Sequence, residues 1–508
     1  MYTFFKTLAA TAFFTTLAYI RYTSLANTPA TSFIECLQTI QGNRSSYLST
    51  PSSPTYDKDR VLFNKAFDHR PGAIFYPASE NDAAAAVLCA ASHHVSVVPR
   101  SGGHSFEGYS GGSQGTLVID LTLFQHFSID HDTGIVTIGA GHRLGSVYTK
   151  LWTAGEYLVP AGTCPGVGIG GHALGGGVGM LGRKYGMLSD NVVGLNMISA
   201  EGEVWHISDT SRSDLFWALR GAGGGSFGLV TEFKIQAYKA PPKVTVMRVR
   251  FPWSEHRAVM DSFGKWSAKI SANDISAMLY IGQNKTVFLG TFLGSQDKAK
   301  AAVAPLLSLT GAPQQIEFRE GTWFQAASTW AALDGTKIDN PIGNFSLSLR
   351  LRSLLYRNPL SENELEIISR HLSNGPSDIE NPKHRLISSV TMETWGGKID
   401  DPKSPSAFDN HRGVLYSVQY GVERVAPRSW HSDSICTTCA EWSDRFSHEL
   451  HAAYSSGDVL EAYQNYMEHG IPNGLQAYYG ENLARLVEIK RAVDPDNLFT
   501  FPQAIPLG

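Results

Sequence analysis

The sequence predicts an α+β protein built from two lobes, and three observations carry this prediction. Residues 56–240 alternate short β-like segments with turns and glycine-rich loops, and the stretch Ala240-Pro-Pro-Lys243 then marks a boundary. Beyond it, longer segments alternate apolar and polar residues, which is typical of strands with one buried face. A chain of 508 residues is long enough for this division. We therefore expect a glycine-loop lobe and a second lobe on a mixed or antiparallel sheet covered by helices.

The elements of the first lobe follow from caps and short apolar runs. Ser79-Glu80-Asn81-Asp82 is a capping box, which predicts that a helix begins there and continues through the alanine-rich run to Cys89. Short β-branched runs predict five strands, at 95–98, 116–119, 135–139, 192–198 and 229–236.

The second lobe has clearer strand patterns. In 345–352 the residues Phe345, Leu347, Leu349 and Leu351 share one face, and polar residues occupy the other. Segments 276–282 and 286–292 predict a hairpin, and strands are expected at 385–395 and 414–420. Helices are predicted at 295–309, 361–372 and 434–454. An open sheet face in this lobe would be a natural floor for a ligand.

Composition excludes some classes of function. The chain has 17% charged and 43% hydrophobic residues, as expected for a globular protein. Its formal net charge of −4 gives no positive field that would attract nucleic acid. We therefore expect no nucleic-acid partner. We also expect the protein to be a monomer.

Residues 1–26 have the pattern of a cleaved secretory signal. Lys6 precedes an uncharged run from Thr7 to Ile20, and small residues follow. The run is shorter than the roughly 20 residues that a membrane span needs, so we favour secretion over a permanent anchor and expect no membrane association after cleavage. Three sequons, at Asn43, Asn284 and Asn344, would permit glycosylation.

The chain has five cysteines, so at least one does not pair within the chain. Cys36 and Cys89 are the candidate disulfide, and Cys164 is the odd residue. Cys436 and Cys439 lie near His431, His448 and His451, a set that would satisfy a tetrahedral zinc site. We favour a local disulfide or two buried thiols on a helix, and expect no metal.

Two glycine-rich loops carry most of the functional information. Arg100-Ser-Gly-Gly-His-Ser105 follows a short β run and offers backbone N–H groups without a Cβ to block close approach, which suits a diphosphate. The loop that begins at Ala161 holds eleven glycines in residues 161–186, and a third glycine loop spans 221–228. The second loop contains G-x-G-x-x-A at 168–173 and G-x-G-x-x-G at 177–182, so a nicotinamide dinucleotide fold is an alternative. We disfavour it because Gly175-Gly-Gly177 would destabilise the required helix by about 1 kcal/mol per glycine relative to alanine.

Five motifs in this order resemble one family. They are R-S-G-G-H-S, A-G-T-C-P-x-V-G-x-G-G-H, L-S-D-N-V-V-G, G-G-G-S-F-G-L-V-T and, near the end, Y-Y-G-E-N-x-x-R-L-x-x-I-K with D-P-D-N-L-F. The chain resembles the berberine bridge enzyme-like branch of the vanillyl-alcohol oxidase flavoproteins, and is most similar to the fungal carbohydrate oxidases. The resemblance implies a two-part FAD-binding domain of the PCMH type, at 27–240 and 461–508, with the C-terminal helix folding back onto it. It also implies a substrate domain at 241–460.

The resemblance implies that the FAD is bound through two covalent bonds, from His104 to the 8α carbon of the flavin and from Cys164 to C6. Taken alone, these residues would be interpreted as a turn histidine and a small buried residue. A thiolate or imidazole can add to the electrophilic oxidised ring, which makes the implied chemistry reasonable. Val167 lies where the family admits O2 to the flavin, and a small side chain there favours an oxidase. The other expected cofactor-binding residues are Arg100, Ser101, Gly102, Gly103, Ser105, Gly168, Gly170, Gly171, His172, Gly228, Val230, Tyr479 and Asn482.

Removal of hydride from an alcohol carbon needs a base for the hydroxyl proton. Tyr463-Gln-Asn-Tyr466 resembles the Y-x-N-Y element of the family, which makes Tyr466 the candidate base. Where the carbohydrate oxidases have Q-x-D, this chain has Thr391 and Glu393, so Glu393 could accept a proton from Tyr466. The loss of the amide at Thr391 weakens the sugar assignment, and Gln419 could orient the hydroxyl instead. A surface Glu393 and core tyrosines are the structural alternative, and Phe106 stands where some relatives have tyrosine.

We therefore expect a secreted FAD-linked oxidase that oxidises an alcohol or hemiacetal carbon, with an oligosaccharide favoured as substrate, and reduces O2 to H2O2. An alternative is an FAD-linked enzyme of fungal secondary metabolism that oxidises, desaturates or cyclises a small metabolite. The third hypothesis is a secreted flavin-binding protein without catalytic activity.

Overall fold

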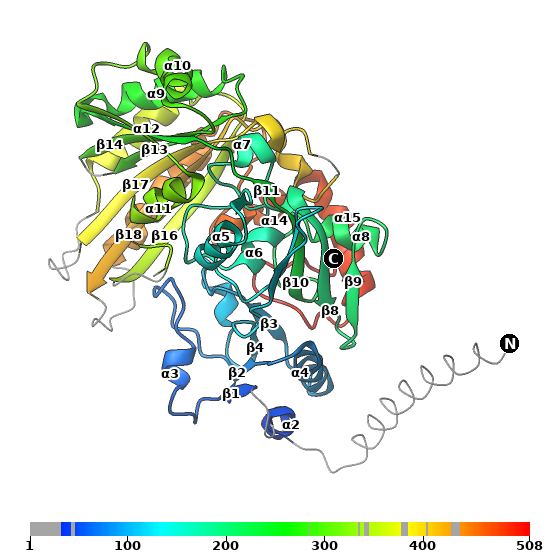
Figure 1. Ribbon diagram of the computed structural model, residues 1–508. Helices are drawn as coiled ribbons and strands as arrows, with labels where there is room; N and C mark the ends of the chain where they lie inside the picture. The colour runs from blue at the N-terminus through cyan, green and yellow to red at the C-terminus, as the bar shows by residue number, and fades with distance from the viewer. Residues whose placement is uncertain are drawn as a thin grey trace.

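The computed structural model confirms the predicted α+β architecture (Figure 1). It describes residues 32–41, 46–282, 284–333, 336–339, 345–376, 385–402, 405–427 and 437–508. The predicted signal segment 1–26, the sequon asparagines Asn43 and Asn344, and His431 and Cys436 lie outside the described residues.

Two sheets form the centre of the first lobe. A four-stranded sheet has the order β1-β2-β4-β3, in which β2, β4 and β3 are parallel. An antiparallel five-stranded sheet has the order β5-β6-β10-β8-β9. The strands are β1 (Tyr47–Ser49), β2 (Ala73–Tyr76), β3 (Val97–Arg100), β4 (Leu117–Asp120), β5 (Phe127–Ile129), β6 (Ile135–Gly139), β8 (Val192–Ile198), β9 (Val204–Ile207) and β10 (Leu229–Gln236). All five strands predicted from sequence are therefore present.

The helices of this lobe are short apart from one. The capped alanine-rich helix α4 (Glu80–Ser92) begins where predicted, because the Ser79 hydroxyl accepts a hydrogen bond from the backbone N–H of Asp82. The Asp82 carboxylate accepts instead from Ser46, 3.0 Å away. The others are α2 (Phe33–Gln41), α3 (Tyr56–Asp59), α5 (Leu144–Thr153), α6 (Ile169–Leu174), α7 (Gly182–Tyr185) and α8 (Ser213–Ala218).

The second lobe is built on an antiparallel seven-stranded sheet with the order β15-β12-β14-β13-β17-β18-β16. The strands are β12 (Val244–Phe251), β13 (Ile275–Gly282), β14 (Lys285–Phe292), β15 (Gln315–Gly321), β16 (Phe345–Tyr356), β17 (Arg385–Thr394) and β18 (Tyr416–Pro427). The predicted hairpin is β13–β14, and Asn284 in its turn has the left-handed φ of 61°.

Helices cover one face of this sheet, where a second hydrophobic core forms (Figure 1). They are α9 (His256–Ser267), α10 (Gln296–Leu307), α12 (Glu362–Ser373) and α13 (Thr437–Ala453). The helix α11 (Trp323–Leu333) contacts both β12 and α5. It therefore joins the sheet to the first lobe.

The C-terminal segment returns to the first lobe, as predicted. Helix α14 (Gly474–Tyr479) precedes α15 (Leu483–Val493), which contacts α8. The buried ammonium of Lys490 donates to the carbonyl of Ser226, 2.7 Å away, and to the carboxylate of Asp494, 2.6 Å away. These contacts fasten the chain end to the third glycine loop.

Cys36 and Cys89 form a disulfide that links α2 to α4, which confirms the predicted pairing. Cys439 is also disulfide-bonded, so its sulfur is not available as a zinc ligand. Among the described residues, no group of side chains could hold a metal ion. Within the same described part of the chain, no helix is long and apolar enough to cross a membrane.

Candidate active site

The two main glycine loops meet backbone to backbone. A Cβ atom at Gly102 would overlap the backbone nitrogen of Gly168, and a Cβ at Gly168 would overlap that of Gly102. Ser101 extends the contact, because its hydroxyl accepts a hydrogen bond from the backbone N–H of Gly170 at 3.2 Å and donates to Ala140 at 2.6 Å. Only glycine allows this approach, so the pair fixes how the two loops are placed relative to each other.

This contact brings His104 and Cys164 together. The Nε2 atom of His104 lies 3.7 Å from the Sγ atom of Cys164, although the residues belong to different loops. Cys164 keeps its thiol, since the other described cysteines are in disulfides. A nucleophilic nitrogen and a nucleophilic sulfur therefore stand side by side.

The environment of His104 keeps its imidazole neutral. Burial, together with the positive charge of Arg143, lowers the pKa of His104 to about 3. Phe63 stacks on the ring, with centroids 3.6 Å apart. A neutral imidazole retains the lone pair that bonding to an electrophilic carbon requires.

The other predicted residues of the two glycine loops have the following conformations and contacts. Gly103 has a φ of +64°, a conformation that favours glycine, and a Cβ at Gly171 would meet open space. The Nε2 atom of His172 accepts from the backbone N–H of Gly162 at 2.9 Å, and burial lowers the pKa of His172 to about 4. Ser105 accepts from the backbone N–H of Tyr109 at 3.2 Å. Val167 is partly buried, and its carbonyl caps the first turn of α5 at Leu144.

Some expected cofactor residues have other partners in the fold. The guanidinium of Arg100 forms a buried ion pair with Asp120, so this side chain is committed to the protein. Tyr479 donates to the carbonyl of Ala222 at 2.9 Å, and Asn482 donates to Ala407 at 3.1 Å. Val230 is buried, and a Cβ at Gly228 would lie 2.7 Å from the sulfur of Met197. The side chains or Cα positions of these five residues are therefore packed against other parts of the protein.

Tyr466 lies beside the His104 loop. Its ring stacks on Phe106, with centroids 5.1 Å apart, and meets Tyr463 edge-on at 5.0 Å. It ends the short 3-10 turn η6 (Gln464–Tyr466) and is half-buried. The predicted base therefore contacts Phe106, which follows the predicted attachment residue His104 by two positions in the chain.

Glu393, Thr391 and Gln419 lie on one face of the seven-stranded sheet. Thr391 on β17 is directly opposite Gln419 on β18, and Glu393 is two residues along the strand. Burial raises the pKa of Glu393 to about 7. Burial raises the pKa of Tyr463 to about 12, and the charge of Glu393 contributes to this shift, so the carboxyl and Tyr463 interact electrostatically.

Tyr463 is a site residue whose role the sequence did not reveal. Its hydroxyl accepts hydrogen bonds from the backbone N–H of Gly177 at 2.8 Å and from Asn465 at 2.9 Å. Its backbone N–H donates to Ser353 on β16 at 3.0 Å. The residue thus joins the second glycine loop to the sheet.

Arg143 is a second residue near the site that was not predicted, and its guanidinium donates to the carbonyl of Gly166. A lone arginine after a histidine gives no sequence signal.

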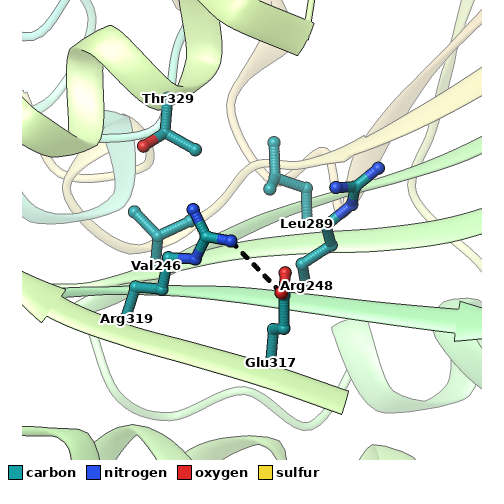
Figure 2. A pocket seen from close by; sticks show the side chains of 6 residues that line it. All are labelled: Val246, Arg248, Leu289, Glu317, Arg319 and Thr329. Atoms are coloured by element: carbon teal, nitrogen blue, oxygen red, sulfur yellow. Dashed lines mark hydrogen bonds and ion pairs between the residues drawn. The ribbon is translucent and has the colours of Figure 1, made fainter. Parts of the chain in front are cut away.

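A separate small pocket lies under α11, on the face of the seven-stranded sheet that carries Glu393 (Figure 2). Its lining residues are Val246, Arg248, Leu289, Glu317, Arg319 and Thr329. Figure 2 shows Arg319 reaching Glu317, and their charged atoms are 3.2 Å apart. The strand register places Glu393 three strands from Arg248, with the buried Leu289 between them. None of the predicted site residues lines this pocket.

The residues around His104 fit a flavin dinucleotide. Two glycine loops in backbone contact offer N–H donors, space is open in front of Gly171, and an imidazole and a thiol are adjacent. This donor set suits a group that carries a diphosphate and an electrophilic ring system.

Comparison with known proteins agrees. Residues 71–208 match the family model described as FAD binding domain, and residues 462–506 match that described as Berberine and berberine like. A chitooligosaccharide oxidase of Gibberella zeae is 31% identical, over 89% of this chain and 91% of that protein. A xylooligosaccharide oxidase of Thermothelomyces thermophilus is 29% identical, over 93% of each chain. The solved structure of Physcomitrella patens BBE-like 1 has 30% identity and a TM-score of 0.82, over 94% of this chain and 100% of that one.

The chain therefore belongs to the berberine bridge enzyme-like family of FAD-linked oxidases. It is an FAD-dependent oxidoreductase.

Proposed function

We propose that the protein is a secreted oxidase that removes a hydride from an alcohol or hemiacetal carbon of an oligosaccharide. In the net reaction the substrate carbon loses a hydride and its hydroxyl loses a proton, which leaves a carbonyl, and O2 takes up both to give H2O2. The observation that carries the proposal is the position of Tyr466, stacked on Phe106 two residues from His104 and coupled through Tyr463 to Glu393.

We infer that FAD is held by His104 and Cys164 and by the backbone of the glycine loops around Gly102 and Gly168. When bound, this group supplies the acceptor for the hydride. The adjacent imidazole and thiol support attachment at two positions. A solved glucooligosaccharide oxidase from Acremonium strictum, 26% identical to this chain, has a 6-S-cysteinyl, 8α-N1-histidyl FAD.

The protein residues then handle the proton. Tyr466 takes the hydroxyl proton, and Glu393 draws it away because its raised pKa of about 7 makes it a competent acceptor near neutral pH. Gln419, opposite Thr391 on the neighbouring strand, orients the hydroxyl. Residues 27–240 and 461–508 bind the cofactor in this proposal, and residues 241–460 bind the substrate.

Two observations support an oligosaccharide substrate and secretion. The solved xylooligosaccharide oxidase in complex with xylobiose has a TM-score of 0.78 to this chain, at 27% identity. The Cys36–Cys89 disulfide suits an oxidising compartment and so supports secretion. We propose that the enzyme acts as a monomer.

A second candidate is the oxidation of a small secondary metabolite. It is favoured by Thr391, which stands where the carbohydrate oxidases have an amide. The FAD-linked oxidoreductase dpmaF of Metarhizium anisopliae is 29% identical over 93% of this chain and 91% of that protein.

Two measurements test the proposal. The absorption spectrum before and after acid precipitation shows whether flavin is covalently bound, and colour that washes away would contradict the attachment. A peroxide-coupled screen then compares xylobiose, cellobiose and chitobiose with small phenolic and terpenoid alcohols. Peroxide with a sugar, lost by at least roughly a hundredfold in Tyr466→Phe at unchanged flavin content, is the expected result. Peroxide with metabolites alone would select the second candidate.

A further inference from the structure

A buried ion pair lies directly behind the proposed base. Arg352 on β16 and Glu468, two residues after Tyr466, have side chains only 5% and 3% exposed, and Arg352 Nε is 2.8 Å from Glu468 Oε1. Ser447 on α13 donates to the same carboxylate oxygen at 2.9 Å. Arg352 also donates to the hydroxyl of Ser443 at 2.9 Å. Residues of β16 and α13, both in the second lobe, therefore bind the carboxylate of Glu468.

The residues before Tyr466 contact the first lobe through side chains, while the backbone N–H of Tyr463 contacts Ser353 on β16. The hydroxyl of Tyr463 accepts from Gly177, and Asn465 donates to the carbonyl of His172 at 3.1 Å. After Tyr466, the backbone N–H of Glu468 donates to the hydroxyl of Tyr478 at 2.7 Å. The short turn that carries the base is thus fixed at both ends, and the Glu468 side chain links its downstream end to β16 and α13 of the second lobe.

The carboxylate of Glu468 is not fully satisfied. Its Oε2 atom has no hydrogen-bond partner and lies 3.8 Å from the Nε2 atom of His451. Burial raises the pKa of Glu468 to about 7 and lowers that of His451 to about 4. The titratable and charged groups around this carboxyl come from several elements: Arg352 on β16, Asp444 and His451 on α13, Tyr420 on β18, Tyr478 on α14, and Glu107 after the His104 loop.

Burying two charges costs desolvation free energy, and replacing a buried ion pair by apolar residues of similar volume often leaves a protein equally stable. The Arg352–Glu468 pair is therefore weak evidence for a role in stability. Its contacts to β16 and α13 instead suit a role in orienting the turn that carries Tyr466. We propose that Glu468 is a positioning residue that, through its ion pair with Arg352, holds Tyr466 in place for proton abstraction. The inference rests on the proposed function only in taking Tyr466 as the base. The contact itself places the 463–468 turn whether or not the substrate is a sugar.

The test compares Glu468→Gln with Glu449→Gln in the flavin-loaded protein. Glu449 lies on α13 and pairs with Arg370 and His371, so the control removes one carboxylate charge from the same region, away from Tyr466. Hydrogen exchange followed by mass spectrometry reports the opening of residues 463–468 without any turnover. We expect exchange there to accelerate by roughly tenfold or more in Glu468→Gln, the loss expected for a charged hydrogen bond, and to stay unchanged in Glu449→Gln.

Two further readouts separate positioning from general structure. In the wild type, protection of 463–468, corrected for intrinsic exchange, should fall as pH increases through about 7, because the pKa of Glu468 is raised in the closed turn and its ionisation favours opening; in Glu468→Gln protection should not change with pH. With a substrate found in the peroxide screen, kcat should fall by roughly tenfold at nearly constant KM. If Glu468→Gln fails to fold, the double variant Arg352→Met/Glu468→Met replaces the pair by apolar volume and is measured instead.

Unchanged exchange at 463–468 in the folded variant would overturn the proposal. This result can be obtained even if no sugar is oxidised, so failure of the positioning role and failure of the proposed function are distinguishable.

Discussion

The rings of Phe106 and Tyr466 stack 5.1 Å apart and within 15° of parallel. The contact joins the loop that carries His104 to the C-terminal segment, two parts of the chain that are far apart in sequence. Because the flat ring of Phe106 offers no hydroxyl, Tyr466 is the phenol of this ring pair that can take a proton. In the proposed function, attachment of the cofactor and abstraction of the proton would both be organised around this aromatic contact.

Covalent attachment through both residues predicts a specific cross-linked peptide. Because His104 and Cys164 are neighbours across the two glycine loops, one flavin could carry both bonds once the side chains separate to reach its 8α and C6 carbons. Proteolysis and mass spectrometry should yield one flavin that joins the His104 and Cys164 peptides. Each single alanine variant should keep flavin on the other residue, and the double variant should lose it on acid precipitation. Flavin found on one peptide alone in the wild type would contradict the bridge.

Gly102→Ala should separate the two glycine loops. Its Cβ would overlap backbone atoms of Gly168, which cannot move as a side chain can. We expect destabilisation of about 1–3 kcal/mol, the range for overpacked sites, together with poor flavin incorporation. Chemical denaturation and the ratio of flavin to protein absorbance measure these effects. Gly457→Ala is the control, since its Cβ would approach nothing closer than 3.8 Å. Equal stability of the two variants would show that the loop contact is dispensable.

The activity of the enzyme should depend on ionised Glu393. Burial raises the pKa of this carboxyl to about 7, so the form that accepts a proton is present above that pH. We expect kcat/KM to fall as pH decreases below about 7, and Glu393→Gln to lose roughly a hundredfold or more with no such acidic limb. A pH–rate profile measured by peroxide formation tests this. An acidic limb that persists in the variant would assign it to another group.

The same carboxyl should affect stability with the opposite dependence on pH. Because its pKa is raised in the folded protein, the uncharged form is favoured there, and its contribution to stability is complete below about pH 4.5 and is lost as pH rises through about 7. Glu393→Gln, which stays uncharged, should therefore gain stability over the wild type as pH rises, by up to about 3 kcal/mol. Urea denaturation at pH 5 and pH 8 measures the difference. A constant difference would show that the carboxyl is not desolvated.

The capping box of α12 provides a stability test away from the site. The Ser361 hydroxyl accepts from the backbone N–H of Glu364, whose carboxylate accepts from the backbone N–H of Ser361 at 2.8 Å. Ser361→Ala should cost about 1 kcal/mol of unfolding free energy. Ser295→Ala is the matched control, because Ser295 precedes α10 without a side-chain cap. Similar losses in both variants would contradict the importance of the box.

Local signals determined much of the fold from the sequence alone. The Ser79 and Ser361 caps, the β13–β14 hairpin and the apolar face of β16 depend on residues a few positions apart, so periodicity and side-chain type predict them. The Cys36–Cys89 pair and the glycine loops were also recognisable. Short strands such as β2, β5 and β9 were missed, because three or four residues give no usable period and gain their stability from neighbours in the sheet.

Only the tertiary structure decided which side chains meet. The backbone contact of Gly102 with Gly168 brings His104 to Cys164, and the return of the C-terminal segment brings Tyr466 to Phe106. The sequence indicated Arg100 as a cofactor residue, yet the fold commits its side chain to Asp120. The burial that sets the pKa of Glu393 and Glu468 likewise comes from segments distant along the chain. Residue types are written in the sequence, whereas distance and desolvation exist only once remote segments have packed together.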